Sequence, residues 1–95
     1  MKAHKIISTA EKWTQGAWAK DALGRHLTQA ESMKDDRAVS FCVAGAIRKA
    51  YVRNRPVIIA SRIVQEAVGM SLQDWNDADG QTWEAVYAKL VELDI

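Results

Sequence analysis

The stretch Ala38–Ile47 constrains the fold of this 95-residue chain more than any other. Nine of its ten residues are apolar or Gly, and Ser40 is the exception. A helix that is apolar on every side must be buried, whereas a surface helix is apolar along one stripe only. Charged residues flank the run on both sides. We therefore predict a central helix over about 37–53, with its first half enclosed by the other helices.

Weaker patterns precede this central segment. Apolar residues at helical spacing predict a first helix over Lys2–Thr14. The segment Ala17–Gly24 is short and rich in Ala, and we expect a turn or a single helical turn there, with Trp18 and Leu23 pointing inward. Residues 26–36 are polar, and their few apolar residues fit a short surface helix as well as a loop.

A further helix is predicted after the central one. It begins at about Pro56, because proline lacks an N–H and is tolerated in the first helical turn. Gly69 is a typical C-terminal stop. Ile59, Ile63 and Ala67 repeat at i, i+4 and i+8, with Val64 and Val68 alongside, which predicts an apolar face on this helix.

The last predicted helix covers Trp83–Asp94, with Thr82 as a favourable N-cap. Residues 70–81 before it are expected to form a loop. No stretch alternates convincingly between apolar and polar residues, as a half-buried strand would. The sequence therefore predicts an all-α fold, with one domain over 1–95 and about four main helices around the central one.

Composition places the chain among globular proteins. The hydrophobic share of 48% and the charged share of 26% are both ordinary. Cys42 is the only cysteine, which excludes an intramolecular disulfide and fits a reducing compartment. Residues 1–8 lack the apolar core of a secretory signal, and no apolar run approaches the ~20 residues of a membrane span. We therefore expect a cytoplasmic protein.

The net charge is only +1, but it is unevenly distributed. Residues 37–65 carry six Arg or Lys and no acidic residue, whereas residues 66–95 carry seven Asp or Glu and one Lys. Two such segments can neutralise each other within one chain or between two copies. We expect a homodimer or higher oligomer, and pairing within one chain is the alternative.

Basic residues surround the predicted end of the central helix and the start of the next. Arg48, Lys49, Arg53 and Arg55 form what we call the basic edge, with Tyr51 among them. Arg and Tyr are enriched in the residues that dominate protein interfaces, so this edge is the predicted contact surface for another protein. Binding of nucleic acid or a nucleotide through 48–55 is the alternative, although a pI near 7.9 is low for a nucleic-acid binder.

Cys42 raises the possibility of thiol chemistry. A cysteine near a helix N-terminus can have a lowered pKa, and a Cys-His pair with His4 or His26 is the minimum for a thiol enzyme. However, Cys42 lies among apolar residues, where a free cysteine usually packs as a small hydrophobic side chain. We therefore predict no catalysis and keep a thiol enzyme using Cys42 as a second alternative.

The acidic segment before the last helix resembles a calcium loop only loosely. Trp75 lies among Asp74, Asp77 and Asp79, and no bidentate Glu follows at the right distance. Turn and capping chemistry is expected there instead, and no metal or cofactor is predicted. Trp75 either packs onto the core or contacts a partner, so it is a further candidate binding residue.

Several short motifs together resemble a known family. They are Trp13–Gly16, Phe41–Ile47, Trp75–Asp77, and Thr82 followed by an amphipathic helix. In these motifs the chain is similar to a family of small uncharacterised proteins from bacterial and phage genomes. The resemblance supplies no catalytic residues and implies a phage or mobile-element accessory protein.

Size and this resemblance lead to the functional expectation. Small helical phage proteins often act by binding, including as inhibitors of host defence, which is an argument by analogy. We expect a non-enzymatic protein that binds another protein, specifically an anti-CRISPR-like inhibitor of a host defence complex or a partner of a nucleic-acid-handling complex. The candidate contact residues are Arg48, Lys49, Tyr51, Arg53, Arg55 and Trp75.

Overall fold

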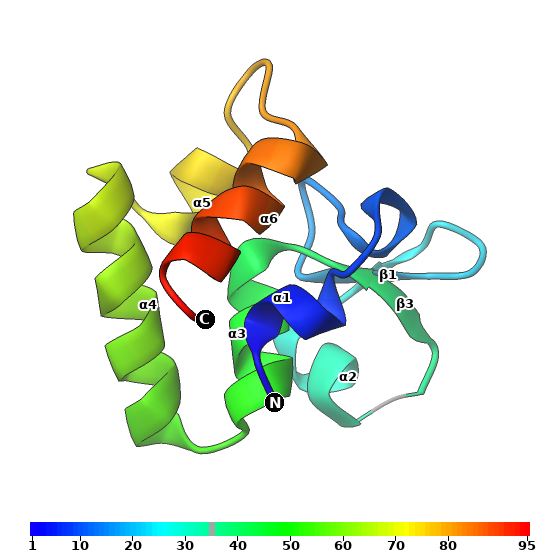
Figure 1. The fold of residues 1–95 in the computed structure, drawn as a ribbon. Coiled ribbons are helices and arrows are strands. Elements are labelled where there is room, and N and C mark those ends of the chain that lie inside the picture. Colours follow the sequence, from blue (N-terminus) through cyan, green and yellow to red (C-terminus); the bar gives the residue numbers. More distant parts are fainter. Residues whose placement is uncertain (35) are drawn as a thin grey trace.

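A computed structural model describes residues 1–34 and 36–95, with side chains for all of these except 32–34. Helices pack around a central helix, and a small sheet lies to one side of it (Figure 1). In chain order the elements are α1 (Ala3–Ile6), the 3₁₀ turn η1 (Ala10–Lys12), β1 (Ala19–Asp21), β2 (His26–Leu27), α2 (Gln29–Lys34), β3 (Ala38–Phe41), α3 (Val43–Tyr51), α4 (Asn54–Val68), α5 (Leu72–Asn76) and α6 (Trp83–Glu92).

The small sheet shows that the all-α prediction is wrong. Its strands run in the order β2-β1-β3 and are antiparallel, with Ala19 opposite both Leu27 and Phe41. The register shifts between Lys20 and Asp21. Strands of two to four residues are too short to display an alternating pattern, so the fold is mixed α and β.

The predicted central helix over about 37–53 is also wrong in its first part. The apolar run enters as strand β3 and continues as helix α3, with an extended Cys42 between them (φ −75°, ψ 173°). The amide of Cys42 donates to the carbonyl of Trp18 at 3.1 Å, which continues the pairing of β1 with β3. Both a buried strand and a buried helix are uniformly apolar, so the pattern alone did not separate them.

The N-terminal third differs from prediction for a related reason. The predicted helix Lys2–Thr14 is reduced to α1 and η1, because Trp13 is extended and the amide of Thr14 donates to the carbonyl of Phe41 at 3.0 Å. Leu23, predicted to point inward, is 77% exposed at the turn between β1 and β2. The carboxylate of Asp21 accepts the amides of Leu23 and Arg25 in that turn.

The predicted helix termini in the second half are confirmed. Pro56 lies in the first turn of α4, and Gly69 ends α4 in the left-handed conformation (φ 75°). The hydroxyl of Thr82 accepts the amide of Ala85 at the start of α6. The predicted loop 70–81, however, contains α5, which Ser71 caps by accepting the amide of Asp74.

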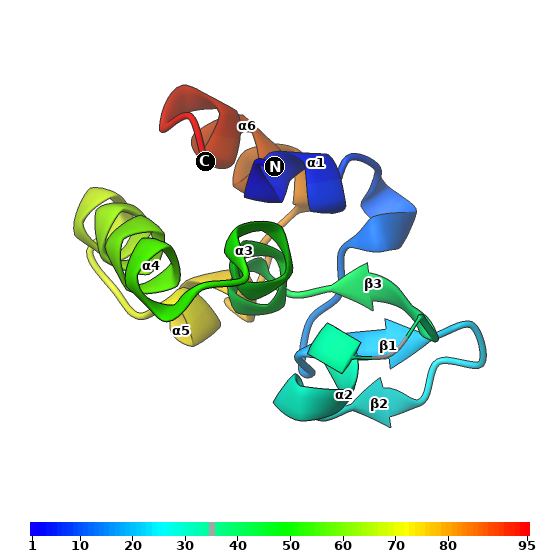
Figure 2. The same cartoon turned by 90° about the horizontal axis from the view of Figure 1, so that it is seen from below.

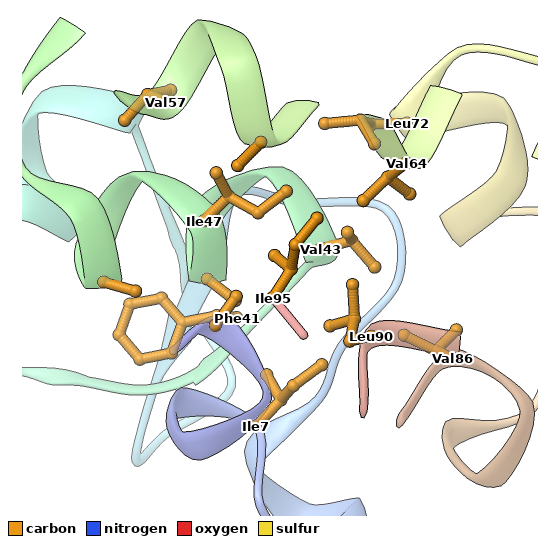
Figure 3. Packing of buried hydrophobic residues seen from close by; sticks show 14 of the residues in the cluster. Ile7, Phe41, Val43, Ile47, Val57, Val64, Leu72, Val86, Leu90 and Ile95 are labelled. Carbon is orange, nitrogen blue, oxygen red and sulfur yellow. The ribbon is translucent and has the colours of Figure 1, made fainter. Parts of the chain in front are cut away.

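The core surrounds α3, as Figures 1 and 2 show from two directions. Helix α1 lies on one side of α3, α4 and α5 lie on another, and α6 packs against α1 (Figure 2). Figure 3 shows Val43 and Ile47 of α3 between side chains from α1, α4, α5 and α6. The fully buried large apolar side chains are Ile7, Val43, Ile47, Val64, Val86 and Leu90.

Candidate functional site

Helix α4 has apolar residues on two opposite sides. Val57, Ala60 and Val64 are buried against the core, whereas Ile59 and Ile63 are 51% and 42% exposed. The sequence places Ile59, Ile63 and Ala67 on one apolar face with Val64 and Val68 alongside, but the structure buries Val64 and leaves Ile59, Ile63 and Ala67 exposed. Periodicity could not decide the question, because either set of residues fits a helical stripe. The outer side of α4 lies at the edge of the molecule, with no other element packed over it (Figure 2).

Charged residues complete this outer surface. At 100° per residue, Arg55, Arg62 and Glu66 fall on the same outward side as Ile59. All three are exposed, and within the part of the chain that the structure describes none of them forms an ion pair. We refer to this surface as the α4 face, which consists of Arg55, Ile58, Ile59, Arg62, Ile63 and Glu66.

A groove adjoins the α4 face on the side of the C-terminal segment. Its volume is about 390 Å³. Tyr51 lines it and donates its hydroxyl to the carbonyl of Ile95 at 3.3 Å. Asp94 lines it as well, and Lys2 pairs with that carboxylate at 3.3 Å. The groove is lined by Tyr51, Arg55, Pro56, Ile59, Ala60, Ile63, Leu93, Asp94 and Ile95.

The basic edge lies at the turn from α3 to α4, at the N-terminal end of the α4 face. Arg48 and Lys49 are half-buried in the last turn of α3, where cations are favoured by the helix dipole. Arg53 and Arg55 are exposed at the start of α4. The structure thus places the predicted basic residues on successive turns, and Arg55 belongs to both the basic edge and the α4 face.

Val52, which sequence analysis did not single out, lies within the basic edge. It is 66% exposed and has a positive φ of 57°, and the amide of Arg53 donates to the carbonyl of Tyr51 across it. A β-branched residue rarely adopts such a conformation. Strained backbone of this kind tends to cluster at binding sites, but no sequence pattern announces it.

Trp75 does not join the basic edge or the groove. It lies in α5, half-buried, and packs against the core. Its carbonyl accepts the side-chain amide of Gln81 at 2.8 Å. The structure therefore places Trp75 as a cover for the edge of the core, as one of the two sequence interpretations expected.

Three of the four motifs that carry the family resemblance meet at Asn76, which is 1% exposed. Its Oδ1 accepts the indole N–H of Trp13 at 2.8 Å and the amide of Val43 at 2.9 Å. Its Nδ2 donates to the carbonyl of Thr14 at 3.0 Å and to Asp77 at 2.9 Å. Both polar atoms of the Asn76 side chain therefore have hydrogen-bond partners. Asn76 links α5 to the segment Trp13–Thr14 and to the start of α3, which is a structural role.

A smaller pocket of about 150 Å³ lies beside Asn76 and includes Cys42. The Sγ of Cys42 accepts the amide of Gly45 at 3.3 Å, and burial raises the pKa of this thiol. His4 packs edge-on against Tyr87, and neither His4 nor His26 lines the pocket. Among the described residues no histidine therefore lines the pocket beside Cys42, and its pKa is raised, whereas an activated thiol has a lowered pKa.

Of the acidic residues near α5, Asp77 connects this region to a distant part of the chain. Asp77 accepts the amide of Gly16 at 3.0 Å, while Asp74 and Asp79 are exposed. Over residues 1–34 and 36–95, no group of three or more His, Cys, Asp and Glu is arranged to hold a metal ion. In the same residues no helix has the length and apolarity that crossing a membrane demands.

A family model, described as a family of unknown function (DUF6197), matches residues 1–92. The chain belongs to this family. The membership confirms the resemblance to an uncharacterised family, and the bacterial or phage origin stays a prediction. No curated protein and no solved structure matches the chain. The DUF6197 family brings no assigned activity, so the function must be inferred from the surfaces of its fold.

Proposed function

We propose that the protein acts without catalysis, by binding another protein in the cytoplasm through the α4 face and the adjoining groove. The observation that carries the proposal is the exposure of Ile58, Ile59 and Ile63 side by side on one helix. Single exposed apolar residues are common on protein surfaces, but a contiguous group beside a groove is typical of a binding site. Burying these side chains against a partner removes apolar surface from water.

Charge defines the chemistry of the partner. Arg55 lies at the rim of the groove, and Arg48, Lys49 and Arg53 continue the positive charge beyond it. A partner that places acidic groups beside an apolar stripe would be attracted to this surface and held in one orientation. An amphipathic helix lying along α4 fits this description.

Nucleic-acid binding through the basic edge is the weaker candidate. Phosphate contacts need cations, whereas half of the α4 face is isoleucine and the face ends in an acidic residue, Glu66. Inhibition of a host defence complex is a more specific form of protein binding, and it stays a prediction.

Capture from a bacterial lysate, with and without nuclease treatment, tests the proposal. Wild type is compared with Ile59→Glu, and Val91→Glu is the matched control because Val91 is similarly exposed on α6. We expect a nuclease-resistant partner that Val91→Glu retains and Ile59→Glu loses. The double variant Arg48→Glu/Arg53→Glu should weaken capture and make it less sensitive to salt.

Two outcomes would contradict the proposal. Retention that disappears after nuclease treatment would indicate nucleic-acid binding through the basic edge. Equal capture by wild type and a folded Ile59→Glu variant would show that the contact surface lies elsewhere on the molecule.

A further inference from the structure

We infer that the partner of the α4 face is a second copy of this chain, with the two α4 helices packed antiparallel about a two-fold axis. This inference rests on the proposed function, because it names the occupant of the same surface. A two-fold contact brings one patch against itself, so the patch must be complementary to its own rotated copy. The α4 face meets that requirement in the order of its charges.

The order of charges along α4 is self-complementary. Arg55 lies near the start of the helix and Glu66 near its end, both on the outward side and both without an ion-pair partner among the described residues. In an antiparallel pair, Arg55 of each copy can lie opposite Glu66 of the other. The two-fold axis then passes between residues 60 and 61, and two ion pairs form.

The same register also pairs the apolar residues. It places Ile59 of each copy opposite Arg62 of the other, with Ile58 and Ile63 on the two flanks of the contact. The aliphatic part of an Arg side chain can cover an apolar neighbour while its charged end stays in water. All four residues are exposed in a single copy, so the pairing buries the isoleucines that the core leaves outside.

Other arrangements are less favourable. Moving the axis two residues toward the N-terminus places Arg55 opposite Arg62, so that like charges meet. Moving it two residues toward the C-terminus places Glu66 opposite Ile59 and leaves Arg55 beyond the end of the other helix. A parallel pair would set each charged residue beside its own copy. The charges of α4 therefore favour one register.

The expected association is weak and reversible, because one helix of 15 residues, about 22 Å long, forms the contact. We expect a dissociation constant on the order of micromolar, as for small transient interfaces. The measurement is sedimentation equilibrium at several concentrations of the full chain, where wild type should shift from about 11 kDa, the mass of one copy, to twice that value.

Charge reversal tests the register directly. Arg55→Glu and Glu66→Arg should each weaken dimerisation by about tenfold or more, because both ion pairs become repulsive. The double variant Arg55→Glu/Glu66→Arg should restore it, because the pairs are re-formed with exchanged signs. Glu84→Arg, an exposed change on α6 with the same effect on net charge, should leave dimerisation unchanged.

A wild-type protein that stays monomeric at every concentration would overturn the inference, and so would a dimer that the double variant fails to restore. These failures differ from failure of the proposed function. If the protein is monomeric but Ile59→Glu still abolishes capture of a partner, the α4 face remains the binding surface and only the second copy is rejected as its partner. A dimer whose dissociation constant is unchanged by every α4 variant would show that the dimer contact lies outside α4.

Discussion

Replacing Gly45 with Ala places the preference of a helix in direct conflict with the packing around it. Gly45 lies in the first half of α3 and has helical backbone angles, so Ala should stabilise the helix by about 1 kcal/mol. A Cβ at this position, however, would lie less than 3.0 Å from the carbonyl oxygen of Trp18. The clash decides whether Gly45→Ala stabilises or destabilises the protein, because a backbone atom cannot turn away as a flexible side chain can.

The magnitude follows from how firmly that carbonyl is held. The Trp18 oxygen accepts the amide of Cys42 at 3.1 Å where β1 pairs with the chain after β3, so moving it disturbs the sheet as well as α3. Overpacking of this kind costs about 1–3 kcal/mol. After the gain in helix propensity, we expect a net loss of up to about 2 kcal/mol and a melting temperature lower by up to ~15 °C.

Thermal unfolding followed by circular dichroism at 222 nm measures this effect. Ala88→Gly, at an exposed position in α6, gives the cost of helix propensity without packing. If Gly45→Ala stabilises the protein by about the amount that Ala88→Gly destabilises it, then α3 does not cross the Trp18 carbonyl as closely as the structure shows.

Three further changes test other parts of the structure. Asn76→Ala leaves partners on two other segments, Trp13–Thr14 and Val43, without hydrogen bonds, so denaturant unfolding should show that the free energy of unfolding falls by about 3–5 kcal/mol; a loss near 1 kcal/mol would refute its linking role. Val52→Gly should raise the melting temperature, because relieving a strained positive φ is worth about 1–3 kcal/mol and exceeds the entropy cost of Gly; a lower value would contradict the strain. Burial raises the pKa of the Cys42 thiol, so the folded state favours the protonated thiol. The resulting contribution to folding stability is complete below the ordinary pKa of about 8.5 and is lost as pH rises through the raised pKa. Urea unfolding should therefore show that raising the pH across this range lowers the free energy of unfolding of wild type more than that of Cys42→Ser. Equal losses in the two proteins would show that the thiol is exposed to water.

Sequence patterns predicted the features that depend on neighbouring residues. The ends of α4 and α6 follow from Pro56, Gly69 and Thr82, whose effects act within one helical turn.

Features that depend on distant residues were not predictable in the same way. The strands β1 and β3 are defined by each other, and the run Ala38–Ile47 changes from strand to helix at Cys42 without any change in hydrophobicity. The partners of Asn76 lie 33 and more residues away in sequence, so its role could not be inferred from its neighbours.

The candidate site was predicted only in part. Arg48, Lys49, Arg53 and Arg55 were identified from the charge pattern, and they lie together at the turn between α3 and α4. The α4 face was missed, because an amphipathic pattern does not reveal which of two apolar stripes the core will cover. Only the packing of Val64 inward shows that the isoleucines are left outside.

Pairing of α4 with α4 of a second copy is most directly tested by a cysteine cross-link. Arg62 is exposed and lies next to the inferred two-fold axis, so Arg62→Cys in a Cys42→Ser background should bring two thiols from different copies together. Serine is itself a good N-cap, so the background change should preserve α3. We predict rapid, disulfide-linked dimers under mild oxidation for Arg62→Cys and not for Ala88→Cys on α6. Equal, slow cross-linking of both variants would contradict the pairing of the α4 faces.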